Sequence, residues 1–276
     1  MSKPDNPQEV AEVVNYIAAV NYGLERLKDL PVSLRLIREI HKELMQGVRG
    51  SERDPGEFRK TQNWIGPEGC SLAQATYVPP PPHEMIQALD NLEKFLHDST
   101  PIPALLKVGL AHAQFETIHP FLDGNGRTGR LLITFLLCEQ NILKRPLLYI
   151  SHYFKKYRTE YYDRLQAVRD TGNWEGWLKF FLRGVYEVAQ EASATARKIV
   201  NLTSSPPHRR TGIPKTHNLG FCFLAPAFRD LLSSGLTVAP QTACSFAFWS
   251  GPPELLASAA CPAAKWFTAA FTSRLW

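Results

Sequence analysis

Two helix-patterned apolar segments flank twelve residues of unusual composition, and this arrangement constrains the fold more than any other feature. Apolar side chains recur at helical spacing on both sides of the stretch His119–Arg130. They are Leu105, Leu106, Leu110, Ala113 and Phe115 before it, and Leu131, Leu132, Phe135 and Leu136 after it. The simplest geometry is a helix, a short loop and a second helix, with the loop at the N-terminus of the second helix.

The residues Gly124–Gly126 predict an anion-binding turn. Glycine accepts backbone angles that other residues resist, so successive N–H groups can turn toward one point. Because these groups stand where a helix begins, the helix dipole adds to the attraction for an anion. A Gly-Asn-Gly sequence by itself is usually only a turn, so the prediction depends on the side chains around it.

Those side chains form a set suited to nucleotide phosphoryl chemistry. Arg127 and Arg130 lie three residues apart, close to one helical face, and each carries a planar fork that fits phosphate oxygens. Asp123 is a hard oxygen ligand of the kind that Mg²⁺ takes alongside phosphates. His119 has an unperturbed pKa near neutrality, as a general base requires. Each residue alone is commonly structural, but chance is a poor explanation for the whole combination at this spacing.

The stretch His119–Arg130 resembles the Fic family pattern His-Pro-Phe-x-Asp-Gly-Asn-Gly-Arg-x-x-Arg at every specified position. The resemblance covers about residues 9–200 and includes four further segments. They are Gln62–Gly66, Tyr77–Pro82, Phe115–Ile118 and Arg158–Tyr162. The resemblance implies a mainly α fold, a Fic-type helical bundle with a short β-hairpin flap.

The resemblance also implies an activity, namely transfer of AMP from ATP to a Ser, Thr or Tyr hydroxyl of a target protein, with release of pyrophosphate. In this reading His119 is the catalytic base and Asp123 is the Mg²⁺ ligand. The nucleotide-binding residues are Gly124, Asn125, Gly126, Arg127, Arg130, Tyr161 and Tyr162. We also expect the ring of Phe121 to lie buried beneath the loop and to fix His119.

A break in the helical pattern precedes the motif. Asn63–Ile65 and Thr76–Val78 are short β-prone runs, with Pro67 and Gly69 between them, which suggests a hairpin. The residues alone favour a surface excursion from a helical bundle. The resemblance instead implies a flap over about residues 62–82, along which a target segment pairs as an added strand. The flap residues expected to contact the target are Trp64, Ile65, Tyr77 and Val78.

Helical periodicity predicts the remaining elements. Helices are expected over residues 9–28, from a cap at Ser33 through Leu44, and over 83–97, 103–116, Thr128 to about Gln140, 151–170 and 173–200. The first two are interpreted as core helices without a chemical role. The domains expected are an N-terminal helix packing on the core (1–32), a Fic core (33–200) and a poorly patterned tail (201–276).

The tail differs sharply in composition from the rest. Eight of its 76 residues are charged, against 49 of the first 200, and no stretch keeps a helical or strand period for long. It is too apolar for a solvated linker. Our hypothesis is an irregular segment that is a frame-shifted translation, a degenerate remnant or disordered.

Charge and cysteine content exclude several classes of function. The net charge is +5, but the tail holds six Lys/Arg against two Asp/Glu, and the first 200 residues hold 25 against 24. The patterned part is therefore nearly neutral and gives no case for nucleic-acid binding. Neither a secretory signal nor a membrane span is expected. The five scattered cysteines lack metal or redox spacing, so a reducing cytoplasm is the expected location.

Regulation is less clearly encoded. Fic proteins are commonly silenced by a helix with Ser/Thr-x-x-x-Glu-Gly/Asn, whose glutamate pairs with the second motif arginine, here Arg130. In similar chains that helix precedes the segment beginning near Glu9, and the only textual match here, Thr171–Gly176, is interpreted as coincidental. Truncation is the favoured explanation; a separate inhibitor or antitoxin protein and a constitutively active enzyme are the others.

Two further functions stay open at this stage. The same fold could remove AMP, or transfer another nucleotide or phosphate-linked group. Alternatively, the chain could be a truncated, non-catalytic relative that acts as a partner in a toxin–antitoxin-type module.

Overall fold

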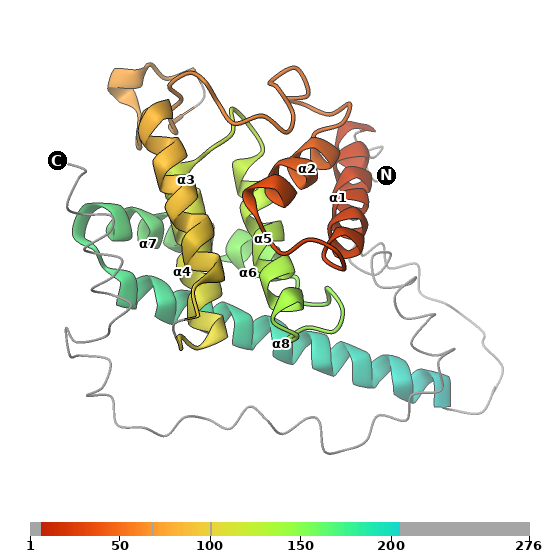
Figure 1. The fold of residues 1–276 in the computed structure, drawn as a ribbon. Helices are drawn as coiled ribbons and strands as arrows, with labels where there is room; N and C mark the ends of the chain where they lie inside the picture. Colours follow the sequence, from red (N-terminus) through yellow and green to blue (C-terminus); the bar gives the residue numbers. More distant parts are fainter. Residues whose placement is uncertain (1–6, 68, 100, 205–276) are drawn as a thin grey trace, which may run out of the picture. The chain divides into compact units, whose positions relative to one another are not determined.

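A computed structural model describes residues 7–67, 69–99 and 101–204, and their regular structure is helical (Figure 1). The elements are α1 (Pro7–Arg26), α2 (Leu34–Leu44), a short 3₁₀ helix η1 (Leu72–Gln74), α3 (Pro82–His97), α4 (Ala104–Ile118), α5 (Asn125–Glu139), α6 (Ile150–Lys156), α7 (Arg158–Thr171) and α8 (Trp174–Ser204). The chain divides into two units, with the boundary between Ala192 and Ser193. From residue 205 onward, the segment predicted to be an irregular tail lies outside the described residues.

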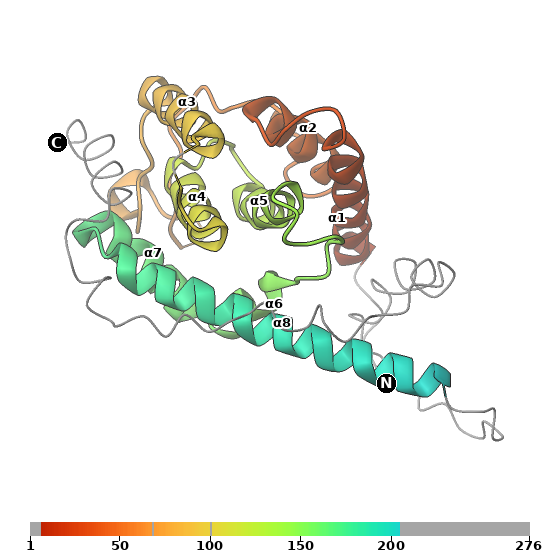
Figure 2. The same ribbon diagram turned by 60° about the horizontal axis from the view of Figure 1, so that its bottom comes forward.

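Helix α5 is the central helix of the first unit (Figures 1 and 2). It packs against α1, α2 and α4. The consecutive residues Leu131–Leu137 are all buried, which is the pattern of a helix covered on every side. Helix α4 is similar, since residues Val108–Glu116 are buried. The loop that joins α4 to α5 is therefore fixed at both ends by buried helices.

Local sequence signals account for several helix ends. Ser33 caps α2 as predicted, because its hydroxyl accepts a hydrogen bond from the N–H of Leu36 at 3.4 Å. Pro82 stands in the first turn of α3, where its missing N–H costs nothing. Gly172 ends α7 in the left-handed conformation typical of a helix C-terminus. Among the described helices there is no candidate membrane span.

The predicted helices are confirmed to within a few residues, with two differences. Helix α5 begins at Asn125 rather than at Thr128, because Gly124 adopts a left-handed N-cap and its carbonyl accepts the N–H of Thr128 at 3.0 Å. The predicted helix over 151–170 is two helices, α6 and α7. They meet at Tyr157, whose backbone angles (φ −110°, ψ 45°) are not helical.

The predicted β-hairpin is not confirmed, because the described residues contain no β-strand. The two sides of residues 62–82 meet at one isolated antiparallel bridge. The N–H of Ile65 donates to the carbonyl of Tyr77 at 2.8 Å, and the N–H of Tyr77 donates back at 3.0 Å. The prolines at 79–82 lack the N–H groups that a longer ladder needs. We keep the name flap for residues 62–82, which form a loop closed at this bridge.

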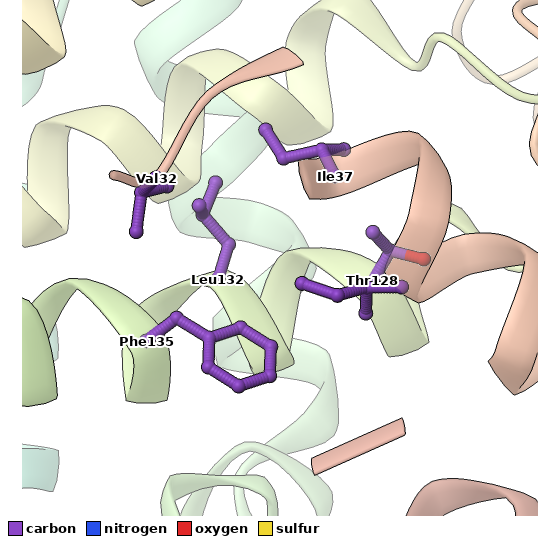
Figure 3. A pocket seen from close by; sticks show the side chains of 6 residues that line it. Val32, Ile37, Thr128, Leu132 and Phe135 are labelled. Atoms are coloured by element: carbon purple, nitrogen blue, oxygen red, sulfur yellow. The ribbon is translucent and has the colours of Figure 1, made fainter. Parts of the chain in front are cut away.

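A small cavity lies between α2 and α5 (Figure 3). Its volume is about 10 Å³, and it is lined by Val32, Ile37, Ile40, Thr128, Leu132 and Phe135. A cavity of this size holds one water at most, and its mainly apolar walls offer few hydrogen bonds. It is a packing gap beneath the motif helix, too small for any ligand larger than a water molecule.

Gly23 in α1 provides a test of how closely α1 and α5 pack. A Cβ atom at this position would lie 2.3 Å from Cζ of the buried Phe135. Glycine to alanine in a helix normally stabilises by roughly 0.5–1 kcal/mol. We expect Gly23→Ala to lower the free energy of unfolding by about 1–3 kcal/mol instead, because the ring must move in a packed core. Urea unfolding measures this, and a stabilised variant would contradict the close contact.

Candidate active site

The loop between α4 and α5 is held in an unusual conformation by the side chain of Asn125. His119 ends α4 in the left-handed region (φ 51°, ψ 60°), which is uncommon for a residue other than glycine. Buried Asn125 bonds both backbone groups of Phe121. The N–H of Phe121 donates to Oδ1 at 2.8 Å, and Nδ2 donates to the carbonyl of Phe121 at 2.7 Å. These bonds fix the path of the chain directly after His119.

Phe121 is fully buried, as expected, and lies among aromatic rings. It stacks on His41 with ring centroids 3.7 Å apart and an interplanar angle of 1°. The ring of Phe58 lies at 5.4 Å and that of Phe115 at 6.5 Å. The loop is therefore anchored by an apolar side chain as well as by hydrogen bonds.

Arg59 is a residue that the sequence analysis missed. Its side chain is 3% exposed and donates to backbone carbonyls at both ends of the flap region and at the end of α4. The acceptors are His119 at 3.0 Å, Thr61 at 3.2 Å, Ile118 at 3.5 Å and Pro80. Its own N–H donates to the carbonyl of Pro120 at 2.9 Å. No sequence signal identifies this role, since an arginine in a polar loop usually faces solvent.

His41 gives α2, which was interpreted as a core helix without a chemical role, a hydrogen-bonded contact with the motif loop. Nδ1 accepts the N–H of Gly56 at 2.8 Å, so a neutral ring carries its proton on Nε2. Nε2 then donates to the carbonyl of Asp123 at 3.0 Å. Burial lowers the pKa of His41 to about 4, which keeps the ring neutral near pH 7. The backbone of the loop is thus bound from α2.

Gly124 turns the chain from the loop into α5 at a position where no side chain fits. Its φ is 77°, and a Cβ atom would lie 2.7 Å from Sδ of Met45 and 3.1 Å from Nε2 of His41. Its N–H donates to Oδ1 of Asp123 at 2.6 Å. The next three N–H groups, of residues 125–127, belong to the first helical turn and have no acceptor within the helix. They form an N-terminal site suited to an anion.

The two motif arginines are weakly engaged by other side chains. The Nη1 atom of Arg127 lies 3.8 Å from Oε2 of Glu12 in α1 and has no hydrogen-bond partner among the described residues, although it is buried. Its Nη2 contacts Sδ of Met45 at 3.2 Å. Arg130 forms no ion pair within the described part of the chain. Both guanidiniums therefore retain capacity for an anionic ligand.

His119 is half-buried, and its Nδ1 atom is buried without a hydrogen-bond partner in the described structure. Burial, and next the charge of Arg169, lower the pKa of His119 to about 4, while the carbonyl of Glu116 opposes the shift. The imidazole is consequently neutral near pH 7, which is the form that accepts a proton. Because Nδ1 is enclosed, Nε2 is the nitrogen left for that exchange.

A buried carboxyl group stands beside this site. Oε1 of Glu116 lacks a hydrogen-bond partner among the described residues, and a Cβ atom on Gly129 would approach it to 2.5 Å. Burial raises the pKa of Glu116, whereas the charges of Arg130 and Arg169 lower it. Gly129 thus leaves the space that this side chain occupies against α5.

The two predicted nucleotide-binding tyrosines differ in exposure, since Tyr161 is buried and Tyr162 is exposed. Tyr161 is 4% exposed, and its hydroxyl donates to Nε2 of His112 at 3.1 Å; Nδ1 of His112 donates to the carbonyl of Gly129 at 3.0 Å. Tyr162 is 52% exposed, with the guanidinium of Arg158 5.7 Å from its ring. Nucleotide binding by this pair stays a prediction, and Tyr162 is the member that is open to solvent.

The four flap residues also differ in placement. Trp64 is 43% exposed and Val78 is 46% exposed, whereas Ile65 and Tyr77 form the bridge. The indole N–H of Trp64 donates to the carbonyl of Cys70 at 2.9 Å. An exposed aromatic and an exposed aliphatic side chain thus stand opposite each other, one position beyond the antiparallel bridge on each of its two segments. Contact of these residues with a target stays a prediction.

The described residues contain no cluster of three or more side chains that could hold a metal ion. Asp123 is a single carboxylate, and its Oδ1 is already bonded to the N–H of Gly124. Mg²⁺ commonly takes one or two protein carboxylates together with substrate phosphates and water. Asp123 therefore fits a magnesium ion that arrives with phosphates and does not fit a metal held by protein alone.

Comparison with known proteins identifies a family that matches the segment containing the motif. Residues 31–137 match the family described as Fic/DOC. Relatives named "Protein adenylyltransferase Fic" include one from Aedes aegypti, 30% identical over 183 residues, and one from Drosophila grimshawi, 29% identical over 183 residues. Each alignment covers 65% of this chain, and 32% and 33% of the respective relatives. The chain thus spans about a third of the length of these relatives.

Two solved structures share the fold. A Fic family protein from Desulfovibrio desulfuricans G20 aligns with a TM-score of 0.61 and 22% identity, over 83% of this chain and 68% of its own. Fic-1 from C. elegans aligns with a TM-score of 0.55 and 22% identity, over 72% of this chain and 55% of its own. At this level of identity the likeness concerns the fold.

Two buried histidines predict a pH dependence of stability. Burial lowers the pKa of His41 to about 4 and that of His112 to about 3, both below the value near 6.5 of an unfolded chain. Their contribution to stability is full above pH 6.5 and is lost as the pH falls toward 4. We expect the free energy of unfolding to decline there by about 1.4 kcal/mol per pH unit for each histidine.

Urea unfolding between pH 7.5 and 4.5 measures that slope. His41→Gln should reduce it, because one protonation on unfolding is removed. His152→Gln, which removes an exposed imidazole, is the control and should leave the slope unchanged. A wild-type stability that stays constant from pH 6.5 to 5 would contradict the buried, neutral state of both rings.

Proposed function

We propose, from the premise that residues 31–137 of this chain belong to the Fic/DOC family, that the protein transfers AMP from ATP to a Ser, Thr or Tyr hydroxyl of a target protein. The family and the adenylyltransferase names of the relatives support the reaction class. The geometry of the loop between α4 and α5 supports the assignment of roles to residues.

One observation carries the proposal. The first-turn amides of α5, two arginines one turn apart and a neutral imidazole all belong to a single loop and helix start. Arg130 lacks an ion pair within the described residues, and the ion pair of Arg127 with Glu12 is long, at 3.8 Å. A polyanion supplies the acceptors that these donors lack, and the triphosphate of a nucleotide is a polyanion whose oxygens suit both backbone amides and guanidinium forks.

The phosphates would be bound in two parts. The α-phosphate accepts hydrogen bonds from the amides at the start of α5, beginning after Gly124. The forks of Arg127 and Arg130 hold the β- and γ-phosphates. Asp123 would hold the magnesium ion through its free oxygen, and the ion would neutralise charge on the phosphates. Positioning and charge stabilisation supply most of the rate in reactions of this kind.

The chemical step itself needs one protein group. Nε2 of His119 takes the proton of the target hydroxyl while that oxygen bonds to the α-phosphorus. The bond between the α-phosphorus and the bridging oxygen breaks, and pyrophosphate leaves with both electrons of that bond. The low pKa of His119 keeps the base form populated near pH 7.

The target segment would lie along the flap. The bridge between Ile65 and Tyr77 leaves neighbouring backbone groups of the flap outside any ladder, so an extended segment can pair with them. Main-chain pairing of this kind accepts many sequences, and the exposed side chains of Trp64 and Val78 would add a preference for apolar neighbours of the modified hydroxyl.

The direct test is incubation of the protein with α-labelled ATP, Mg²⁺ and a cell lysate, followed by mass spectrometry of the labelled band. The proposal requires an added AMP on a Ser, Thr or Tyr. Label that appears from γ-labelled ATP instead would indicate a different transferred group.

His119→Ala tests the proposed base. We expect turnover to fall by roughly 10²–10⁴-fold, the usual worth of a positioned general base, because no other group at the site replaces the imidazole. The rise in melting temperature on adding Mg-ATP should persist, because the variant keeps the phosphate site. His152→Ala is the matched control. Equal labelling by the His119 variant and the wild type would refute the role.

Asp123→Ala tests the metal ligand. We expect loss of activity together with loss of its dependence on Mg²⁺, because the only carboxylate proposed at the phosphates is removed. Initial rates of AMP transfer across a magnesium titration provide the measurement. A variant that is fully active without added metal would contradict the assignment.

A further inference from the structure

Arg169 in α7 is a half-buried arginine to which the mechanism assigns no contact with a reacting group, yet its guanidinium contacts both the flap and the end of α4. Its Cζ atom lies 3.8 Å from the ring centroid of Tyr77 in the flap. Its Nη2 donates to the carbonyl of Glu116 at 3.2 Å, and its Nε donates to Oγ1 of Thr117 at 3.4 Å. Both acceptors belong to the last turn of α4, directly before His119.

Arg169, Tyr77 and the last turn of α4 each contact the other two. The hydroxyl of Tyr77 donates to the carbonyl of Thr117 at 2.9 Å, on the same turn that Arg169 binds. The backbone of Tyr77 makes both hydrogen bonds of the bridge to Ile65. Besides Arg59, which bonds the carbonyls of Pro80 and His119, this aromatic ring and this guanidinium join the flap to the helix end that carries His119.

The chemistry of the contact is specific to arginine. A planar guanidinium can stack flat on a ring and donate from its edge at the same time, a geometry that the compact, non-planar ammonium of lysine does not reproduce. Stacking of this kind is worth about 0.5–2 kcal/mol, depending on burial. That range corresponds to roughly twofold to thirtyfold in the population of the joined state.

We propose that Arg169 is a positioning residue that holds the flap in register with His119, so that a segment paired along the flap presents its hydroxyl to the imidazole. The kinetic part of this inference rests on the proposed AMP transfer. The structural part, the coupling of the flap to the end of α4, does not depend on any activity.

Hydrogen exchange tests the structural part. The exchange rates of the amides of Ile65 and Tyr77, which are both hydrogen-bonded across the flap, are measured in the wild type, in Arg169→Gln and in a control variant. The control is Arg164→Gln, which removes another arginine of α7, one that pairs with Glu160. We expect about tenfold faster exchange of both amides in Arg169→Gln and unchanged exchange in the control. Unchanged exchange in Arg169→Gln would overturn the proposal.

Tyr77→Leu provides a second route should Arg169→Gln fold poorly. It removes the ring and should accelerate the amide of Ile65 as Arg169→Gln does, whereas Tyr77→Phe keeps the stacked ring and should have a smaller effect. In the double variant, the effects of Arg169→Gln and Tyr77→Leu should be less than additive. Full additivity would show that the two side chains act independently, and would overturn the proposal.

Kinetics separate positioning from general stability. With an identified target, Arg169→Gln should raise the KM for the target about tenfold and leave the KM for ATP within about twofold, because the phosphate site is intact. Equal effects on both constants would indicate a merely structural role. A wild type that transfers no AMP would refute the proposed function, and the exchange experiment would still decide the coupling.

Discussion

Hydrogen bonds from local and distant side chains to the backbone at the end of α4 and in the loop after it are the constraint on which the site depends. The side chain of Asn125 bonds the backbone N–H and carbonyl of Phe121. The side chain of Arg59 donates to the carbonyls of residues 118 and 119, and His41 donates to the carbonyl of Asp123. A chain that turns through a left-handed histidine is costly by itself. It persists because these bonds satisfy buried polar groups that no regular ladder reaches.

Neutral histidines are a recurring element around the start of α5. His41 and His112 lie on different helices, and each donates from one ring nitrogen to a backbone carbonyl near that helix start. Each uses its other nitrogen as an acceptor, so protonation would break a bond as well as bury a charge. Burial lowers the pKa of both, and also that of His119. Burial thus keeps both the histidines that bind the scaffold and the proposed base in the neutral form.

The sequence predicted the parts of the fold that depend on local pattern. The helix, loop and helix around the motif, the cap at Ser33 and the burial of Phe121 follow from periodicity, capping chemistry and the size of an aromatic ring. Elements whose form depends on pairing or packing were predicted less well. The β-prone runs formed one bridge at Ile65, and the aromatic segment after residue 150 broke at Tyr157.

The sequence by itself determined which chemical groups stand at the motif, because their order and spacing place a base, a carboxylate, an amide turn and two guanidiniums within twelve residues. Tertiary structure decided how those groups are held and ionised. Arg59 and His41 reach the loop across 60 and 82 positions of the chain, and burial, which depends on every packed neighbour, sets the pKa of His119. No local pattern encodes such contacts, because they exist only once helices remote in sequence have packed together.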